Sequence, residues 1–237
     1  MRIALASYEF RNKDISFNLH QIERGMEAVC GKADLLCFGE AFLQGFDALC
    51  WDYQTDLMMA IPQKSELVDS ICNLSKRYGV DLGVGYIERA GDDLYSSYML
   101  IEDGRFAHNY RRISHGWKEY WRTDEHYREG DSTEEFFYRG ETMQIALCGD
   151  MWDYPERFHT SGILLWPVFV DFSSEEWQEN EADYAAQATL ASDRTVLVDS
   201  LCYESEPNGI GGAFYFRSGR TAEKLTTGTE GVLIVTL

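Results

Sequence analysis

Short apolar runs alternate with amphipathic segments along the first third of the chain, and this alternation limits the possible folds more than any other feature. Residues 2–8 and 33–38 are apolar runs of the length of a strand. Between them, apolar residues recur with the spacing of one helix face, at Leu19, Ile22, Met26 and Val29. When a helix joins two neighbouring strands, the strands usually run parallel. This pattern therefore predicts a parallel crossover whose helix ends at Gly31.

The pattern then repeats and changes into strand against strand. Residues 67–78, after Pro62, predict a helix, and residues 81–86 predict a strand. The strands predicted at residues 94–101 and 105–110 flank Asp103-Gly104, which is a hairpin signal. Further strands are predicted at residues 135–138, 143–148, 163–168 and 196–201, a helix at 182–191, and a last pair of strands, 212–216 and 231–236, around Ser218-Gly219. We therefore expect one α/β domain over residues 1–237, with helices packed on two stacked sheets.

The amino-acid composition limits the kinds of binding partner and the cellular compartment that we expect for this chain. Of the 237 residues, 45% are hydrophobic, which is enough for one large core. The chain carries 40 acidic and 21 basic residues, a formal net charge of −19, so its surface should repel nucleic acid and anionic membranes. No run approaches the roughly 18 consecutive apolar residues that cross a bilayer, and no charged leader precedes the first strand. These features favour a cytoplasmic protein.

One cysteine has a setting that suits chemistry. The six cysteines show neither CxxC nor Cys/His spacing, so no zinc site or disulfide framework is expected. Cys148 ends an apolar strand and is followed by Gly149-Asp150. A sharp turn after a strand exposes the side chain and aims N–H groups at the same point, which suits a nucleophile and an oxyanion. The alternative is an inert buried cysteine.

A carboxylate stands at the end of another predicted strand. Glu40 follows the apolar run at residues 33–38 and lies among apolar neighbours. Burial disfavours the charged form of a carboxyl group, and this suits a general base that works near neutral pH. The alternative is an ion pair with a nearby basic residue.

A long polar and aromatic segment, residues 114–133, predicts a loop with at most one helical turn. Loops of this length without a core of their own are often functional. Its aromatic residues, Trp117, Tyr120 and Trp121, are candidates with Trp152 for lining a narrow pocket. Packing in the core or in a dimer interface is the alternative.

Taken in chain order, the motifs resemble the nitrilase superfamily, the thiol carbon–nitrogen hydrolases, over nearly the whole length. The segments that carry the resemblance are Gly39-Glu40 with Phe42 and Gly45-Phe46, Asn109 to Arg112, Leu147 to Glu156, Leu165-Trp166-Pro167, and Gly209 to Ala213. The resemblance implies a four-layer α-β-β-α sandwich in a single domain. It also implies a homodimer or a higher homo-oligomer built by stacking equivalent sandwiches.

The resemblance assigns roles to three residues. It implies that Glu40 is the general base, Cys148 the nucleophile, and residue 112 the cation that stabilises the tetrahedral intermediate. The family has lysine at this last position, whereas this sequence has Arg112. Arginine keeps the charge but replaces a compact ammonium with a planar fork. Lys118, six residues further on, is an alternative source of the cation.

The family also uses a second glutamate on the loop between the cation and the nucleophile. The segment Asp124 to Tyr127 resembles that region, and Glu125 is our choice, with Glu119 and Glu129 as alternatives. The family's small serine after the late glycine pair is Ala213 here, which we expect to affect substrate choice.

The implied activity is hydrolysis of a small amide or N-carbamoyl compound through a thioester on Cys148, with release of ammonia or an amine. No metal or organic cofactor is required. Aliphatic amides, ω-amides of dicarboxylic acids and N-carbamoyl amines are all open as substrates, and amidase chemistry is favoured over nitrile hydrolysis. Arg112 supports one alternative, a catalytically impaired family member that acts as a binding or assembly protein. A redox-sensing thiol at Cys148 is a weaker third, since no other cysteine lies near it in sequence.

Overall fold

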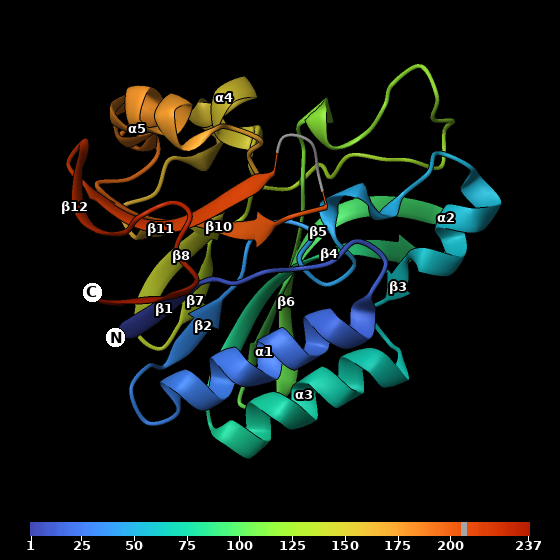
Figure 1. Ribbon diagram of the computed structural model, residues 1–237, viewed down its shortest axis with the longest axis horizontal. Coiled ribbons are helices and arrows are strands. Elements are labelled where there is room, and N and C mark those ends of the chain that lie inside the picture. Colours follow the sequence, from blue (N-terminus) through green and yellow to red (C-terminus); the bar gives the residue numbers. More distant parts are fainter. Residues whose placement is uncertain (205–207) are drawn as a thin grey trace.

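Two β-sheets form the centre of the molecule in the computed structural model, which describes residues 1–204 and 208–237 (Figure 1). The first sheet has seven strands, in the order β13-β1-β2-β4-β5-β6 with β3 paired to β4. The second has six strands in the order β12-β11-β10-β9-β8-β7. Each sheet thus combines a parallel centre with antiparallel additions, and the parallel crossover predicted for the first sheet is present.

The strands of the first sheet are β1 (Arg2–Ser7), β2 (Leu35–Cys37), β3 (Ile61–Pro62), β4 (Asp81–Ala90), β5 (Asp93–Glu102), β6 (Arg105–Arg111) and β13 (Gly231–Thr236). Those of the second sheet are β7 (Phe136–Tyr138), β8 (Glu141–Ile145), β9 (Ile163–Pro167), β10 (Arg194–Cys202), β11 (Gly209–Arg217) and β12 (Arg220–Leu225). Three short 3₁₀ turns connect these elements, at Phe46–Ala48, His115–Trp117 and Pro155–Phe158.

Helices cover the outer face of each sheet. α1 (Ile15–Val29) and α3 (Glu66–Tyr78) lie side by side on the first sheet, and α4 (Asp150–Asp153) and α5 (Ser174–Ala188) lie on the opposite side of the molecule (Figure 1). α2 (Tyr53–Met59) lies between β2 and β3 in the chain. This arrangement confirms the predicted four-layer α-β-β-α sandwich. Among the described residues, no helix is both long enough and apolar enough to span a membrane.

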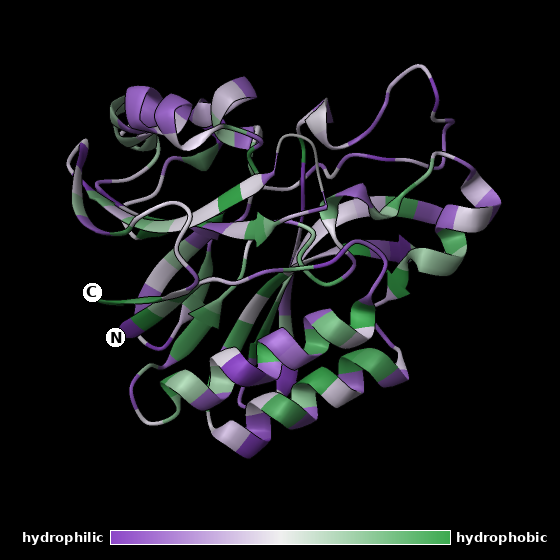
Figure 2. Ribbon diagram, in the orientation of Figure 1, coloured by the Kyte–Doolittle hydropathy of each residue, from purple (hydrophilic) through white to green (hydrophobic). Residues whose placement is uncertain are grey.

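Apolar residues fill the space between the layers. One cluster joins the two sheets, with Leu5 and Tyr98 from the first and Leu165 from the second. A second cluster packs Ile22 and Met26 of α1 against the outer face of the first sheet. In Figure 2 the short strand β2 is hydrophobic, whereas most of α5 is hydrophilic.

Most predicted elements are present, and two predictions were wrong. The hairpin at Asp103-Gly104 is confirmed, because β5 and β6 pair on either side of it. The helix predicted at residues 182–191 begins earlier, as α5, because Ser173 and Glu176 form a capping box before its polar first turns. The turn at Ser218-Gly219 leads into β12, a polar strand that pairs with β11, whereas β13 crosses to the other sheet and pairs with β1.

Candidate active site

Three of the predicted site residues lie just beyond the ends of strands. Arg112 directly follows β6, Glu40 follows β2 and Cys148 follows β8. The two sheets meet here, because the backbone N–H of Glu40 donates to the carbonyl of Val168, beyond β9 of the second sheet, at 3.2 Å. Carboxyl ends of parallel strands are a common place for a site in α/β folds.

Glu40 and Arg112 form a buried ion pair. Arg112 Nη1 lies 2.9 Å from Glu40 Oε1, with side chains only 3% and 0% exposed. Ser96 Oγ donates to the same carboxyl oxygen at 3.0 Å. The other oxygen, Glu40 Oε2, is buried and has no hydrogen-bond partner among the described residues. Oε2 is therefore the oxygen left to accept a proton.

Arg112 is held charged at the centre of this cluster. Burial lowers its pKa, but the neighbouring acidic groups, first among them the Glu40 carboxylate, outweigh that effect and raise the pKa above the ordinary value. Its Nε donates to Ser114 Oγ at 2.7 Å. A buried ion pair of this kind is costly to break, because one charge would then remain without a partner.

Cys148 lies at a sharp bend between β8 and α4. Its φ of +42° is in the left-handed region, which non-glycine residues seldom adopt. Two hydrogen bonds fix the bend: its N–H donates to the Pro167 carbonyl and its carbonyl accepts from Trp166 Nε1, both at 2.9 Å. The side chain remains partly exposed. The predicted strand-to-helix corner is thus present, although β8 ends at Ile145, earlier than expected.

The thiol of Cys148 is protonated at rest. Burial raises its pKa to about 12, the Glu40 carboxylate acts in the same direction, and Arg112 opposes both. Sγ lies 3.6 Å from the carbonyl oxygen of Phe169, to which it donates. Because the thiolate is the nucleophilic form, this cysteine needs a base at the moment of attack.

Asp150 ties the segment that carries Cys148 to the segment that carries Arg112. Its Oδ2 accepts from the N–H of Leu147 at 2.8 Å and from the hydroxyl of Tyr110 at 2.6 Å. Its Oδ1 accepts from the backbone N–H groups of Ile113 and Ser114, at 3.1 and 2.8 Å. Burial raises the pKa of Asp150, and Arg112 and these hydrogen bonds oppose the shift. The sequence analysis gave Asp150 no role of its own.

Asp199 on β10 is another acid near the site that the sequence analysis missed. It is buried, and its Oδ2 has no hydrogen-bond partner among the described residues. Burial raises the pKa of Asp199 well above its ordinary value; the Ser200 and Val170 amides oppose this and Glu40 adds to it. The charge of Asp199 also acts on the pKa of Cys148. A carboxyl inside an apolar strand, Val196 to Ser200, was the available signal.

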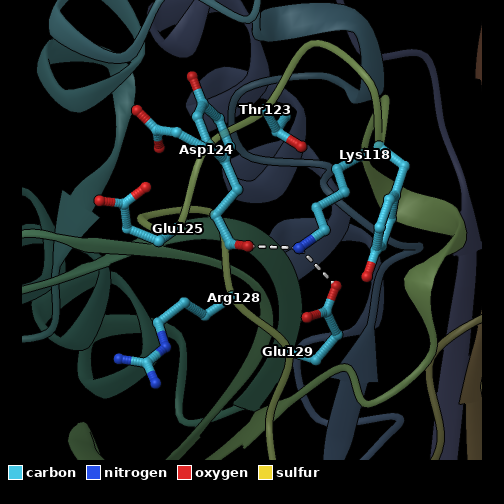
Figure 3. A pocket seen from close by; sticks show the side chains of 8 residues that line it. Lys118, Thr123, Asp124, Glu125, Arg128 and Glu129 are labelled. Carbon is cyan, nitrogen blue, oxygen red and sulfur yellow. Dashed lines mark hydrogen bonds and ion pairs between the residues drawn. The ribbon is translucent and has the colours of Figure 1, made fainter.

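Residues of the loop line a cavity of their own (Figure 3). A cavity of about 490 Å³ is lined by Lys118, Tyr120, Thr123, Asp124, Glu125, Tyr127, Arg128 and Glu129. Within it, Lys118 Nζ pairs with Glu129 at 2.7 Å and donates to the Tyr127 carbonyl. Lys118 therefore has its own partners, and the cation paired with Glu40 is Arg112.

The structure does not bring Glu125 to the other three predicted residues. Its side chain is exposed on the wall of the loop cavity, and no described contact joins it to Glu40, Arg112 or Cys148. Glu129, one of the alternatives, is bound by Lys118 and by His115 at 3.1 Å. Glu119 is partly buried in the same loop.

The four aromatic candidates have different settings. Trp152 packs edge-on to Tyr184 and lies 6.1 Å from the ring of Trp166, whose Nε1 binds Cys148. It is the candidate with a link to the nucleophile. Trp117 is buried in a small cluster with Tyr127, and Tyr120 and Trp121 are exposed.

The sequence matches a known family model and a known amidase. Residues 2–161 match the family model described as carbon-nitrogen hydrolase. An (R)-stereoselective amidase from Pseudomonas sp. is 26% identical over 156 residues, which is 66% of this chain and 54% of that protein. The matched part of the chain therefore spans about half the length of this relative.

Solved structures share the fold. A CN-hydrolase superfamily protein from Xanthomonas campestris aligns with a TM-score of 0.80 at 15% identity, covering 99% of this chain and 89% of that one. A glutamate-to-glutamine mutant of the amidase from Nesterenkonia sp. AN1, with the acetamide moiety of fluoroacetamide on its active-site cysteine, aligns with a TM-score of 0.77 at 16% identity, covering 100% of this chain and 90% of that one. A glutamine-dependent NAD+ synthetase from Acinetobacter baumannii aligns with a TM-score of 0.77 at 16% identity. The alignment covers 98% of this chain but only 44% of the synthetase.

Proposed function

Because the chain belongs to the carbon-nitrogen hydrolase family, we propose that it is a thiol amidase with Cys148 as its nucleophile. Its substrate in this proposal is a small amide or an N-carbamoyl compound, whose carbon–nitrogen bond is hydrolysed. The amidases among its relatives support this class. The natural substrate within the class is to be found by the experiment below.

One observation carries the proposal: a buried acid and a buried cation act together on a single protonated thiol. Glu40 and Arg112 are paired at 2.9 Å, and both act on the pKa of Cys148, in opposite directions. An adjacent base makes a thiol nucleophilic, and a fixed cation stabilises the negative charge that develops in acyl transfer. These are the two requirements of thiol-dependent amide hydrolysis.

Acylation begins with proton transfer. Glu40 Oε2 takes the Sγ proton as sulfur attacks the carbonyl carbon, and a carbon–sulfur bond forms while the carbonyl oxygen becomes negative. Arg112 and the backbone N–H groups near Gly149 stabilise that oxygen. Glu40 then donates its proton to the nitrogen, the carbon–nitrogen bond breaks, and ammonia or an amine leaves.

Deacylation reverses these roles with water. Glu40 takes a proton from the water that attacks the thioester carbon, and Arg112 again stabilises the oxyanion. The carbon–sulfur bond breaks, the acid leaves, and the proton returns to Sγ.

We keep Glu125 as the proposed second glutamate of the mechanism. Its support is the family resemblance of its loop segment together with its place on the wall of an open cavity. Glu119 and Glu129 are the alternatives, and the Lys118 ion pair gives Glu129 a structural role of its own.

The resemblance also supports proposals on assembly and location. We propose that the protein forms a homodimer or a higher homo-oligomer in the cytoplasm. Light scattering after size-exclusion chromatography would give the mass of the assembly; a monomer at micromolar concentration would contradict the first of these proposals.

The decisive experiment measures product release from a panel of substrates. The purified protein is incubated with aliphatic amides, ω-amides of dicarboxylic acids, N-carbamoyl amines and nitriles, and ammonia or amine is measured. We expect turnover of at least one amide or carbamoyl compound, and its loss in Cys148→Ala. Cys30→Ala is the matched control, because Cys30 is exposed at the C-terminal end of α1 and has no part in the mechanism.

Two results would contradict the proposal. Equal turnover in the wild type and in Cys148→Ala would exclude the thiol mechanism. Absence of turnover across the panel, with Cys148 no more reactive to iodoacetamide than Cys30, would favour the non-catalytic binding protein. Nothing in the comparisons supports that alternative, and the acid, the cation and the thiol are all retained.

A further inference from the structure

We infer that Gly116 and Gly149 are positioning residues that make room for an arginine in this site. Arg112 Nη2 lies between these two glycines, and in this inference it is the atom that binds the oxyanion. The inference rests on the proposed function and specifies how its cation works. It concerns a part of the site in which this chain departs from the family's lysine.

Two of the three guanidinium nitrogens have a fixed partner. Nε donates to Ser114 Oγ at 2.7 Å and Nη1 to Glu40 Oε1 at 2.9 Å. The third nitrogen, Nη2, has no hydrogen-bond partner among the described residues, although the side chain is only 3% exposed. Because a guanidinium is planar, the two bonds fix the direction in which the free N–H groups of Nη2 point.

Nη2 lies against the backbone of two glycines. A Cβ added to Gly149 would meet it at 2.6 Å, and one added to Gly116 at 2.8 Å, both closer than a real Cβ contact. Gly149 immediately follows the nucleophile, so the free donors lie beside the residue at which the tetrahedral intermediate forms. The effect of Arg112 on the pKa of Cys148 agrees with this placement.

Backbone conformation does not explain the glycine at position 149. Gly149 has φ −62° and ψ −14°, which every residue adopts in a helix. Gly116 is also outside the positive-φ set, unlike Gly45 or Gly211. These two glycines therefore provide space, and the group that occupies the space is the guanidinium.

This arrangement lets one side chain serve two partners at once. Nη1 remains on Glu40 while Nη2 is free for the oxygen of the substrate. A lysine ammonium is a single nitrogen without this fork, so it needs less width at residues 116 and 149. Arginine at position 112 and glycine at position 149 should then depend on each other, and this dependence is testable.

The experiment compares four proteins: wild type, Gly149→Ala, Arg112→Lys and the double variant. Turnover of the best amide of the panel gives kcat and KM, and the rate of fluoroacetamide addition at Cys148, followed by intact mass, gives a second readout. In that addition sulfur bonds to the methylene carbon, fluoride leaves with the electron pair, and Glu40 takes the thiol proton. Gly231→Ala is the control, since its Cβ would have ordinary contacts no closer than 3.5 Å.

We expect Gly149→Ala to lower kcat roughly 100-fold with little change in KM, the size of effect that loss of an oxyanion donor has. The double variant should regain at least about tenfold over Gly149→Ala, because lysine leaves room for the new Cβ. Gly231→Ala should match the wild type. Gly116→Ala should also lower kcat and be improved by Arg112→Lys.

Other outcomes overturn the inference. An undiminished kcat in Gly149→Ala would show that glycine and arginine are independent. The same would follow if the fold loss of kcat in the double variant equalled the product of the losses in the two single variants. If Gly149→Ala and the double variant both fail to fold, glycine serves backbone packing alone. A wild type without turnover or fluoroacetamide addition would instead contradict the proposed function.

Discussion

Two of the cation–carboxylate clusters among the described residues, Arg112 with Glu40 and Lys118 with Glu129, differ in burial and in what holds them. Arg112 and Glu40 are 3% and 0% exposed, whereas Lys118 and Glu129 of the loop are 7% and 21% exposed. Strand ends and buried hydrogen bonds fix the first pair, while the second belongs to a loop beside an open cavity.

The difference shows which pair is suited to chemistry. In a buried cluster, charges act strongly on one another, and their positions are set before a substrate arrives. In the loop cluster, Glu129 is partly exposed beside an open cavity, so water weakens the same kind of interaction. Substituting corresponding members of the two clusters tests this contrast.

The largest expected effect follows removal of the buried cation. Arg112→Met should lower turnover roughly 1000-fold, and it should destabilise the protein by about 3–5 kcal/mol because Glu40 remains buried without its cation. Lys118→Met, the matched substitution in the loop, should cost less than about 1 kcal/mol. Urea unfolding followed by circular dichroism measures both. Equal losses of stability would remove the contrast between the clusters.

The next effect concerns the three loop glutamates. If Glu125 acts in the mechanism, Glu125→Gln should lower kcat roughly 100-fold, with the melting temperature unchanged because the side chain is exposed. Glu119→Gln and Glu129→Gln are the matched controls. A loss confined to Glu119→Gln or Glu129→Gln would transfer the role to that residue, and full activity in all three would remove the second glutamate from the mechanism.

A smaller effect is expected at the residue that joins the parts of the buried cluster. Asp150→Asn retains one acceptor oxygen but cannot accept from both Tyr110 and Leu147 at the Oδ2 position. We expect a loss of about 2 kcal/mol in stability and roughly tenfold in kcat. Asp153→Asn, in the same short helix but exposed, is the control. An Asp150→Asn protein as active and stable as this control would contradict the joining role.

Sequence patterns predicted the elements that carry the site, because local signals specify them. Apolar runs end before Glu40 and Cys148, and the Asp103-Gly104 hairpin leads to Arg112. The strands that were misplaced depend on distant partners. β13 pairs with β1, more than 200 residues away, and β12 is polar enough that no apolar pattern marks it.

The supporting residues of the site could not be predicted for the same reason. Asp150 binds the N–H groups of Ile113 and Ser114, 37 and 36 residues away in the chain. Ser96 reaches Glu40 from β5, 56 residues further along. The contacts of Asp150 exist only after the two sheets are packed together, and the contact of Ser96 exists only after β2, β4 and β5 have assembled into one sheet. A motif therefore indicates which residues are candidates for the reaction, and the tertiary structure shows which residues hold them.

The smallest expected effect is a pH dependence of stability in the loop cluster. Burial raises the pKa of Glu129, but Lys118 and His115 outweigh it, so the pKa lies below its ordinary value of 4.5. A carboxyl whose pKa is depressed by folding stabilises the protein above the unfolded value and loses that contribution as pH falls through the folded value. The difference in free energy of unfolding between wild type and Glu129→Gln should therefore shrink as the pH falls below 4.5, from a value under about 1 kcal/mol. Urea unfolding between pH 3 and pH 7 measures this difference, with Glu125→Gln as the exposed control. A difference that grows as the pH falls would show that Glu129 is not stabilised as a carboxylate. The contrast between the two clusters would then lie in the sign of the charge interaction as well as in its size.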